Sequence, residues 1–445
     1  MKILTARLST MRASALIGIT ALSLTAAGCT PATTTSVADG ETAEIVEISM
    51  LTYSADGYDA LNIEMIAAFQ EEYPNVKVNL VYQPGGGEGD NLLKTKLATG
   101  EMEDLFLQAT GAQLASLQPD QNLVNLADEA WIDDMAESFI EVVDTEMGIY
   151  GAPYGTMMGG MILYNKPVYQ ELELKIPVTW DEFMENNQVI KDSGIAAPII
   201  QTYEATWSSQ LFVLGDFANV SAVDPGWADK FTANEVRTAE QPAVQSWLNQ
   251  QVAFEAGFFN VDYASATFED GMRMLALGEG VHYPMLSGAL DTLFQNFPEN
   301  TNDIGGFAIP AQKAEDTTLT VWPPNALYIP TTTVGAKREA ALAFLAFISS
   351  EKGCAVQNEF GAPTGPYVFS CVLPDTVPSI LKDLQVYFDE NRASPALEFV
   401  SPIKGPNLEF ITVEVGSGIR SGAEGAALYD EDVKKQAQQL GLEGW

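Results

Sequence analysis

From Ile45 onward, hydrophobic residues recur along the chain in two patterns, one typical of strands and one typical of helices. An apolar run predicts a buried strand over residues 45–53, and apolar residues at helical spacing over 61–69 predict a helix that ends before Pro74. Valine and leucine alternate with polar residues over 76–80, which predicts a second strand. Strands and helices that alternate at this spacing are typical of βαβ units, so we expect an α/β fold with mostly parallel sheets.

The same alternation continues and suggests where a ligand would bind. A helix is expected from Asp90, as N-cap, to Gly100, with a third strand over 105–107. In parallel sheets the ligand crevice lies beyond the carboxyl ends of the strands. The glycine run 85–89 follows the second strand, but it lacks the lysine and hydroxyl of a P-loop and the last glycine of a dinucleotide fingerprint. We therefore interpret the run as a flexible lip of a cleft.

The first 28 residues have the pattern of an export signal. Basic residues precede a short apolar stretch over 13–24, and the sequence Ala-Ala-Gly-Cys ends at Cys29. This segment resembles a bacterial lipoprotein signal, which implies cleavage before Cys29 and lipid attachment to its thiol. Residues 29–44 are small and polar and predict a flexible tether. We expect a protein held by lipid on the extracytoplasmic face of the cell membrane, with an ordinary secretory signal as the alternative.

Charge and composition exclude several classes of function. The chain has 60 acidic and 22 basic residues and a formal charge of −38, so nucleic acid is excluded as a partner. The single histidine, His282, leaves no second imidazole for a zinc site, and no nucleophile elbow is present, so we expect no metal, no cofactor and a packed His282. A glycosidase needs only two carboxyl groups and stays open as an alternative.

Two cysteines remain beyond Cys29. An extracytoplasmic compartment permits Cys354 and Cys371 to pair. Their sequence separation does not show whether their Cα atoms approach closely enough, so the sequence leaves this disulfide open.

Several short motifs in a fixed order resemble the family 1 extracellular solute-binding proteins of ABC importers, which include the maltose-binding proteins. The resemblance runs from Ile45 to about Leu440, with Glu103 and the lack of a tryptophan shortly after residues 280–285 as departures. The matching segments are 54–57, 69–78, 96–106, 149–154, 163–166, 176–183 and 340–350.

The resemblance implies a two-lobe periplasmic-binding-protein-like fold with a multi-segment hinge. The expected N-terminal lobe comprises residues 45–160 and 306–360, and the expected C-terminal lobe comprises 163–303 and 367–445. The chain is expected to cross between the lobes near 161–164, 305–309 and 360–366.

The implied function is capture of a sugar, specifically an oligosaccharide, and its delivery to an ABC permease by a monomeric, non-enzymatic receptor. Aromatic faces stack on sugar rings, and carboxylates and amides bind hydroxyls, so the candidates are residues of these types near the expected cleft. They are Trp322, Asn325, Trp207, Tyr53, Asp56, Gln83, Tyr154 and Tyr283. Trp131 and Trp180 are expected to pack in the interior, the latter because residues 179–182 predict the start of a helix with Thr179 as its N-cap.

Three other functions remain as alternatives. The same fold could bind a polyol or glycerol phosphate, although the shortage of arginine disfavours phosphate. A surface glycan-binding lipoprotein could act without a transporter, and a secreted glycosidase is the less favoured third alternative.

Overall fold

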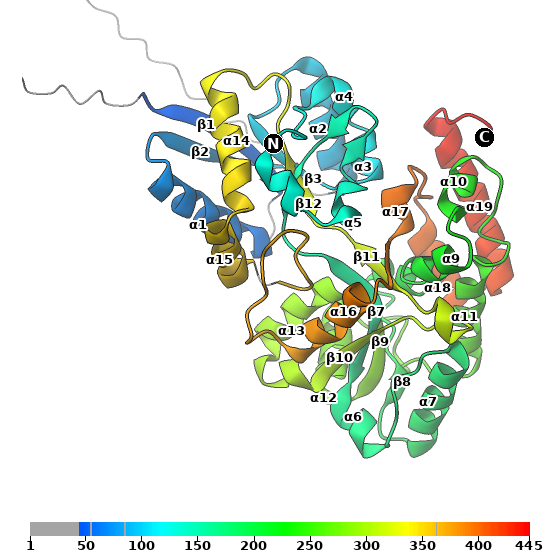
Figure 1. Cartoon of the computed structure of the whole chain (residues 1–445). Coiled ribbons are helices and arrows are strands. Elements are labelled where there is room, and N and C mark those ends of the chain that lie inside the picture. Colours follow the sequence, from blue (N-terminus) through cyan, green and yellow to red (C-terminus); the bar gives the residue numbers. More distant parts are fainter. Residues whose placement is uncertain (1–43, 54–55, 84–85, 362) are drawn as a thin grey trace, which may run out of the picture. The chain divides into compact units, whose positions relative to one another are not determined.

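Two mixed β-sheets with helices packed on them make up the part of the chain that the structure describes (Figure 1). The structure is a computed structural model that describes residues 44–53, 56–83, 86–361 and 363–445, without side-chain burial for 56–58 and 86–88. Residues 44–445 form one compact unit. The predicted signal, Cys29 and residues 29–43 of the predicted tether lie outside the described residues.

The first sheet has the strand order β2-β1-β3-β12-β6. Its core strands are parallel, because β1 pairs with β2 and with β3 in the same direction. The later strands β12 and β6 add antiparallel pairs, so the sheet is mixed where the sequence pattern predicted mostly parallel pairing. The strands are β1 (Val46–Tyr53), β2 (Val76–Gln83), β3 (Leu105–Gln108), β6 (Ala152–Tyr154) and β12 (Asn325–Tyr328). We call this sheet and its helices the first lobe.

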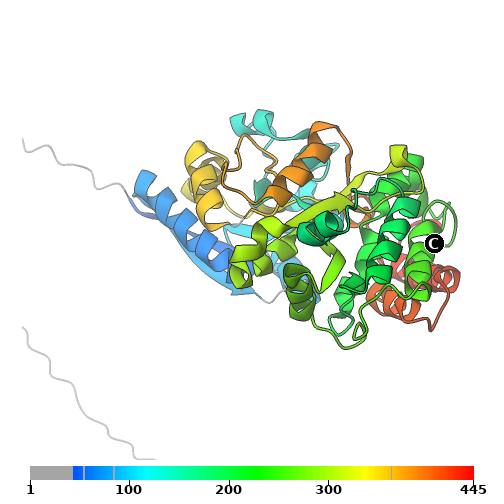
Figure 2. The same ribbon diagram turned by 90° about the horizontal axis from the view of Figure 1, so that it is seen from below.

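Helices of distant sequence position cover this sheet. In both ribbon views α14 and α15 lie beside α1, and the apolar side chains of these helices and of β1 form one core (Figures 1 and 2). The helices of the first lobe are α1 (Asp56–Glu72), α2 (Gly86–Thr99), α3 (Ala112–Ala115), α4 (Pro119–Asn122), η1 (Ala130–Asp134), α5 (Glu137–Ile140), α14 (Ala336–Ile348) and α15 (Glu351–Phe360); β4 (Asp144–Thr145) and β5 (Gly148–Ile149) form a small hairpin.

The helix α2 corrects one expectation from the sequence. Asp90 was expected as its N-cap, but α2 begins at Gly86, so the described part of the glycine run is helical and the interpretation as a flexible lip is wrong there. Residues 84–85 lie outside the described residues. Glycine has low helix propensity, but the buried Leu93 anchors the helix on the sheet, and such tertiary packing overrides propensity.

The second sheet has the order β13-β11-β7-β9-β8, and β10 pairs with β7. Three of its pairings, all made by β7, are antiparallel, so this sheet is also mixed. Its strands are β7 (Met158–Asn165), β8 (Ala197–Ile199), β9 (Gly280–Leu286), β10 (Ile304–Ala308), β11 (Leu319–Trp322) and β13 (Ala393–Pro395). We call this sheet and its helices the second lobe.

Helices account for most of the rest of the second lobe. The helix that begins at Trp180 has the predicted capping box, in which Thr179 and Glu182 satisfy each other's backbone N–H groups. The helices are α6 (Lys166–Glu171), α7 (Trp180–Ser193), η2 (Thr206–Gln210), α8 (Leu211–Leu214), α9 (Phe217–Val223), α10 (Trp227–Thr232), α11 (Val244–Glu255), α12 (Phe268–Leu277), η3 (Ser287–Ala289), α13 (Leu290–Asn296), η4 (Pro298–Asp303), η5 (Ala314–Asp316), α16 (Ser379–Asp389), α17 (Leu397–Val400), α18 (Leu408–Gly416) and α19 (Gly422–Gln439).

The first two crossings between the lobes differ from those expected. Residues 161–164 lie inside β7 and 305–309 belong to or follow β10, which pairs with β7, so both segments are interior to the second sheet. The chain instead crosses at 155–157, between β6 and β7, and at 323–324, between β11 and β12. Gly305 and Gly306 are buried because Tyr164 and Met161 pack where their side chains would be, so neither glycine is a hinge.

The third crossing lies later than expected. The backbone still contacts the first lobe at Val368, whose carbonyl accepts from the Ala136 N–H at 2.7 Å, and Cys371 is bonded to Cys354 in α15. The second-lobe helix α16 then packs on β10. The chain therefore leaves the first lobe between Cys371 and Ser379, and the expected start of the C-terminal lobe at 367 is too early.

No helix among the described residues is both long and apolar enough to cross a membrane.

A candidate ligand cleft between the lobes

A cavity of about 410 Å³ lies where the chain makes its first two crossings between the lobes. We call it the cleft. The first lobe and the crossing segments supply Ala60, Leu61, Tyr154, Thr156, Pro323, Pro324, Asn325, Phe360, Gly361 and Thr364, and the second lobe supplies Met158, Gly288, Asp291 and Gln295. A solute in this cleft would therefore touch both lobes.

The polar wall of the first lobe is built on two adjacent strands. Tyr154 in β6 and Asn325 in β12 lie opposite each other in the antiparallel pairing. The buried hydroxyl of Tyr154 donates to Oδ1 of Asn62 at 2.9 Å, and Nδ2 of Asn62 reaches the hydroxyl of Thr52 at 3.4 Å. This chain of hydrogen bonds fixes the ring of Tyr154 at the edge of the cleft, so the wall is held in place before any ligand arrives.

The polar wall of the second lobe is the helix α13. Its residues Leu290 and Leu293 are fully buried and fasten the helix to the core. Asp291 and Gln295 are four positions apart, which places both on one face of the helix, toward the cleft. Just before α13, the Ser287 hydroxyl accepts from the Gly159 N–H of β7 at 2.9 Å and ties this wall to the second sheet.

Asp291 is the unusual group of the cleft. Its buried Oδ1 has no hydrogen-bond partner among the described residues, and burial raises the pKa of its carboxyl to about 6. Among the described residues that line the cleft there is no lysine, arginine or histidine. A carboxylate without a cation favours ligands that donate hydrogen bonds, such as hydroxyl groups, and repels anions.

Apolar groups line the rest of the cleft. Met158, Phe360 and the pair Pro323–Pro324 supply a surface for the C–H face of a ligand. Gly288 keeps this side open, since a side chain there would come within 2.8 Å of Sδ of Met158. An apolar wall with a few fixed polar groups is the usual composition of a small-molecule site.

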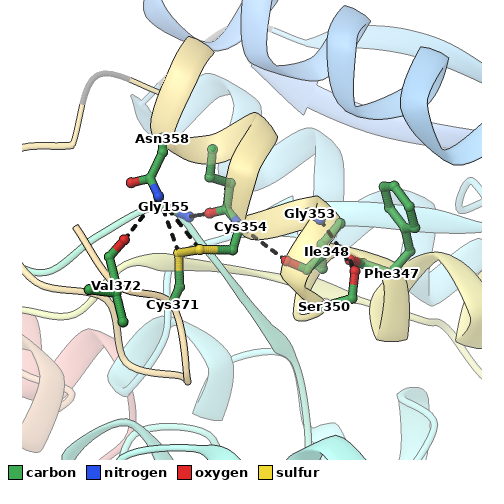
Figure 3. The surroundings of a disulfide bond; sticks show 10 residues. Gly155, Phe347, Ile348, Ser350, Gly353, Cys354, Asn358, Cys371 and Val372 are labelled. Carbon is green, nitrogen blue, oxygen red and sulfur yellow. Dashed lines mark hydrogen bonds between the residues drawn. A yellow bond between two sulfur atoms is a disulfide. The ribbon is translucent and has the colours of Figure 1, made fainter. Parts of the chain in front are cut away.

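A disulfide lies next to the first crossing. Cys354 and Cys371, whose pairing the sequence left open, are bonded, with their Cα atoms 5.4 Å apart (Figure 3). Cys354 belongs to α15, and in that helix Oε1 of the buried Gln357 accepts from the N–H of Gly155 at 3.1 Å. Gly155 has a φ of 109°, which favours glycine at this turn. The disulfide and Gln357 together attach α15 to two of the segments that join the lobes.

Of the predicted ligand-binding residues, the structure brings Tyr154 and Asn325 together in the cleft. Trp322 is only 6% exposed and lies beside the cleft rather than in its lining. Its ring packs against Gly160, and its Nε1–H donates to Glu398 at 2.5 Å. These contacts hold the Trp322 ring at the second crossing, beside the residues that line the cleft.

Two further candidates lie in the second lobe, away from the cleft lining. Tyr283 is 1% exposed, and its hydroxyl shares a 2.6 Å hydrogen bond with Thr202. Trp207 is 40% exposed and packs one side of its ring on Phe268, with 5.5 Å between the ring centres. Neither side chain is near enough to line the cleft as the structure shows it.

The remaining candidates belong to the carboxyl edge of the first sheet. Tyr53 pairs with Gln83 across β1 and β2, and its hydroxyl donates to Gln108 at the end of β3, at 2.7 Å. Gln83 is 3% exposed, and neither its Oε1 nor its Nε2 has a partner among the described residues. Asp56 begins α1, but its side chain lies outside the described residues. This edge is polar as predicted, but it is separate from the cleft lining.

The sequence did not point to Asp291 and Gln295 of the cleft lining. It also did not point to Gln108 at the polar edge of the first sheet. Asp291 comes a few residues after the end of a strand. The chain has 60 acidic residues, and nothing in the sequence around Asp291 marks it as a ligand-binding one. Gln108 sits at the end of the predicted third strand and could have been found by the rule that located Tyr53 and Gln83.

Among the described residues, no three or more histidine, cysteine or acidic side chains are grouped so that they could hold a metal ion. His282 is fully buried and is hydrogen-bonded through both ring nitrogens, to Tyr169 at 2.7 Å and to Asn187 at 2.8 Å. Burial lowers its pKa to about 3, so it is the neutral, packed histidine that the sequence suggested. Trp180 also packs in the core, against Phe183.

Comparisons with known proteins agree on one family. The sequence model of the bacterial extracellular solute-binding proteins matches residues 53–353. A multiple sugar-binding protein of Streptococcus mutans is 22% identical over 263 residues, which is 57% of this chain and 60% of that relative. An uncharacterized ABC transporter extracellular-binding protein of Pyrococcus horikoshii is 25% identical over 346 residues, 74% of this chain and 77% of its own length.

Among solved structures, the binding protein RafE in complex with raffinose superposes with a TM-score of 0.71. The match covers 87% of this chain and 100% of that one at 19% identity, so it establishes the shared two-lobe fold.

Proposed function

Because the chain belongs to the bacterial extracellular solute-binding proteins, we propose that it captures a neutral saccharide, specifically an oligosaccharide, between its lobes and delivers it to an ABC importer. The observation that carries the proposal is the cleft itself. It combines polar groups, Asn325 and Asp291, and the fixed ring of Tyr154 with an apolar surface, and it has no cation in its described lining. The family is one of binding proteins, so the chain is a receptor and not an enzyme.

The named relatives support a sugar as the solute. One is a multiple sugar-binding protein, and the matching solved structure holds raffinose. An extracellular-binding protein of an ABC transporter is the second relative, which supports a permease as the partner. A saccharide presents both hydroxyl groups and apolar C–H faces, and these are the two chemistries that the cleft supplies.

The cleft disfavours one of the alternatives. A glycerol phosphate carries two negative charges near neutral pH and would meet Asp291 with no arginine or lysine to compensate. Neutral polyols remain compatible with the cleft, although they offer less apolar surface than a pyranose ring does. A receptor that acts without a transporter can be told apart in the cell. Deletion of the permease would then leave uptake of the sugar unchanged.

A thermal shift screen of the purified protein tests the function. The panel comprises mono- and oligosaccharides, polyols and glycerol phosphates. A ligand present at about 100 times its dissociation constant stabilises the native state by about 2.7 kcal/mol, which a melting curve resolves. A shift with a saccharide supports the proposal, whereas a shift only with a polyol or a phosphate ester would contradict the assignment of a sugar.

Attachment to the membrane through Cys29 is a separate part of the proposal, supported by the signal sequence. In a bacterial host, Cys29→Ser should move the protein from the membrane fraction to the soluble fraction. Labelled fatty acid should be incorporated into the parent protein and not into Cys29→Ser, and a parent protein without label would rule out the lipid anchor while the function in solute binding still stands.

A further inference from the structure

A second cavity, of about 350 Å³, lies within the second lobe and shares no lining residue with the cleft. Its walls come from α9, from residues 241–249 around the start of α11, and from the loop 311–316 before β11. We call it the second-lobe pocket. It is large enough for a small molecule of monosaccharide size.

A buried carboxylate lines this pocket. Asp216 is 5% exposed, and its Oδ1 accepts from Nδ2 of Asn219 at 2.7 Å. Its Oδ2 makes no hydrogen bond with any described residue, and burial raises the pKa of the carboxyl to about 7. Oδ2 is not among the fully buried unsatisfied atoms, so it is accessible and can accept a hydrogen bond from a ligand or water.

A buried amide donor lines the same pocket. Asn249 is 3% exposed, and its Oδ1 accepts from Gln245 at 3.0 Å and from Gln312 at 3.4 Å. These two bonds fix the orientation of the amide, while its Nδ2 makes no hydrogen bond with any described residue. The pocket thus offers an acceptor on Asp216 and a donor on Asn249, both on side chains that neighbouring residues hold in place.

We propose that the second-lobe pocket is a binding site for a neutral, hydroxyl-bearing molecule of monosaccharide size. A molecule with several hydroxyl groups can donate to Asp216 and accept from Asn249. The lining also carries one charge of each sign, Lys313 and Asp316, which together leave no net charge for a charged ligand to complement. Val220, Val223 and Pro242 provide an apolar surface against which C–H groups can pack. The site is independent of the cleft, so it would be filled whether the lobes are open or closed.

Saturation-transfer NMR on the purified protein tests this site, with D-glucose, D-galactose and myo-inositol as separate probes. Val223 is 55% exposed, so Val223→Trp should fill the pocket from outside without disturbing the core. We expect at least one probe to give a transfer signal that Val223→Trp abolishes. Asp216→Asn, which keeps the shape but loses the charge, should weaken that binding by roughly tenfold or more.

Two controls make the result specific. Val252→Trp introduces the same residue on α11 at a position that is 46% exposed and outside the pocket, and it should leave the signal unchanged. Asp291→Asn weakens binding in the cleft, so a probe signal that Asp291→Asn removes and Val223→Trp leaves intact comes from the cleft and not from the second-lobe pocket. The proposal is overturned if no probe gives a signal, or if the signal survives both Val223→Trp and Asp216→Asn.

Discussion

Asp291 shows how a single side chain can set the character of a binding cleft. Its carboxyl is partly buried, and among the described residues one of its oxygens has no partner and the cleft lining has no cation. Such a group binds a hydroxyl donor well only when it is ionised, because a carboxylate accepts stronger hydrogen bonds than a neutral carboxyl does.

The first prediction concerns this group. With a pKa raised to about 6, Asp291 is ionised at pH 7.5 and gains a proton as the pH falls through 6. Saccharide affinity should therefore be highest above pH 7 and fall below pH 6. Asp291→Asn should bind roughly tenfold more weakly at pH 7.5 and lose this pH dependence, as measured by isothermal titration calorimetry.

Asp128→Asn is the matched control, because Asp128 is exposed in the first lobe and outside the cleft lining. It should bind and titrate as the parent protein does. An Asp291→Asn variant with unchanged affinity at both pH values would remove Asp291 from the site.

The second prediction concerns Trp322, the residue that the sequence favoured most. Trp322→Phe removes the hydrogen bond to Glu398 and should lower the free energy of unfolding by about 1 kcal/mol, without a direct loss of saccharide contact. Trp131→Phe is the control, since Nε1 of Trp131 has no hydrogen-bond partner among the described residues and its loss should cost less. Chemical denaturation and calorimetry give both quantities, and a loss of affinity without loss of stability would restore Trp322 as a ligand contact.

At the scale of elements, the helix α15 connects the lobes more than its position in the sequence suggests. It packs on α1, carries one cysteine of the disulfide, and holds the first crossing through Gln357. The disulfide holds Cys371 against α15, and Gln357 of the same helix holds Gly155 of the first crossing (Figure 3).

The third prediction follows from this connection. The disulfide links residues 17 positions apart, and the double variant Cys354→Ser/Cys371→Ser should lose about 3 kcal/mol of stability by the chain-entropy argument. Reductant should lower the melting temperature of the parent protein and leave that of the double variant unchanged. Equal melting temperatures for parent and variant without reductant would show that the bond adds no stability.

At the scale of the whole molecule, both lobes contribute to one cleft, so ligand binding and lobe movement are coupled. A solute that touches Tyr154 and Asp291 together stabilises the arrangement in which these residues face the same cavity. The crossings at 155–157 and 323–324 are short, and hinge motion needs only a few residues that change their dihedral angles.

The fourth prediction is that a saccharide which gives a thermal shift also reduces the radius of gyration in small-angle scattering. Closure of the lobes on the solute is the physical reason. Glycerol 3-phosphate at the same concentration should change neither the melting temperature nor the radius. An unchanged radius with a bound saccharide would mean that the receptor binds without closure.

The sequence by itself determined the α/β class, the early strands and helices, the capping box at Thr179 and the packed His282. These features depend on local periodicity, capping and composition, which act over a few residues. The order of the family motifs also identified the two-lobe fold, and the candidates Tyr154 and Asn325 lie in the cleft.

Only the tertiary structure decided where the chain crosses between the lobes, that Cys354 and Cys371 pair, and that Asp291 rather than Trp322 lines the cleft. The hydrophobic pattern of β10 would fit a strand of either sheet. Its pairing with β7 is therefore decided by contacts between residues far apart in the sequence. Likewise Trp322 is a large aromatic residue beside a turn, and whether its ring meets a solute or Gly160 depends on which backbone packs next to it. Distances between residues far apart in sequence are set by folding of the whole chain, and no local pattern records them.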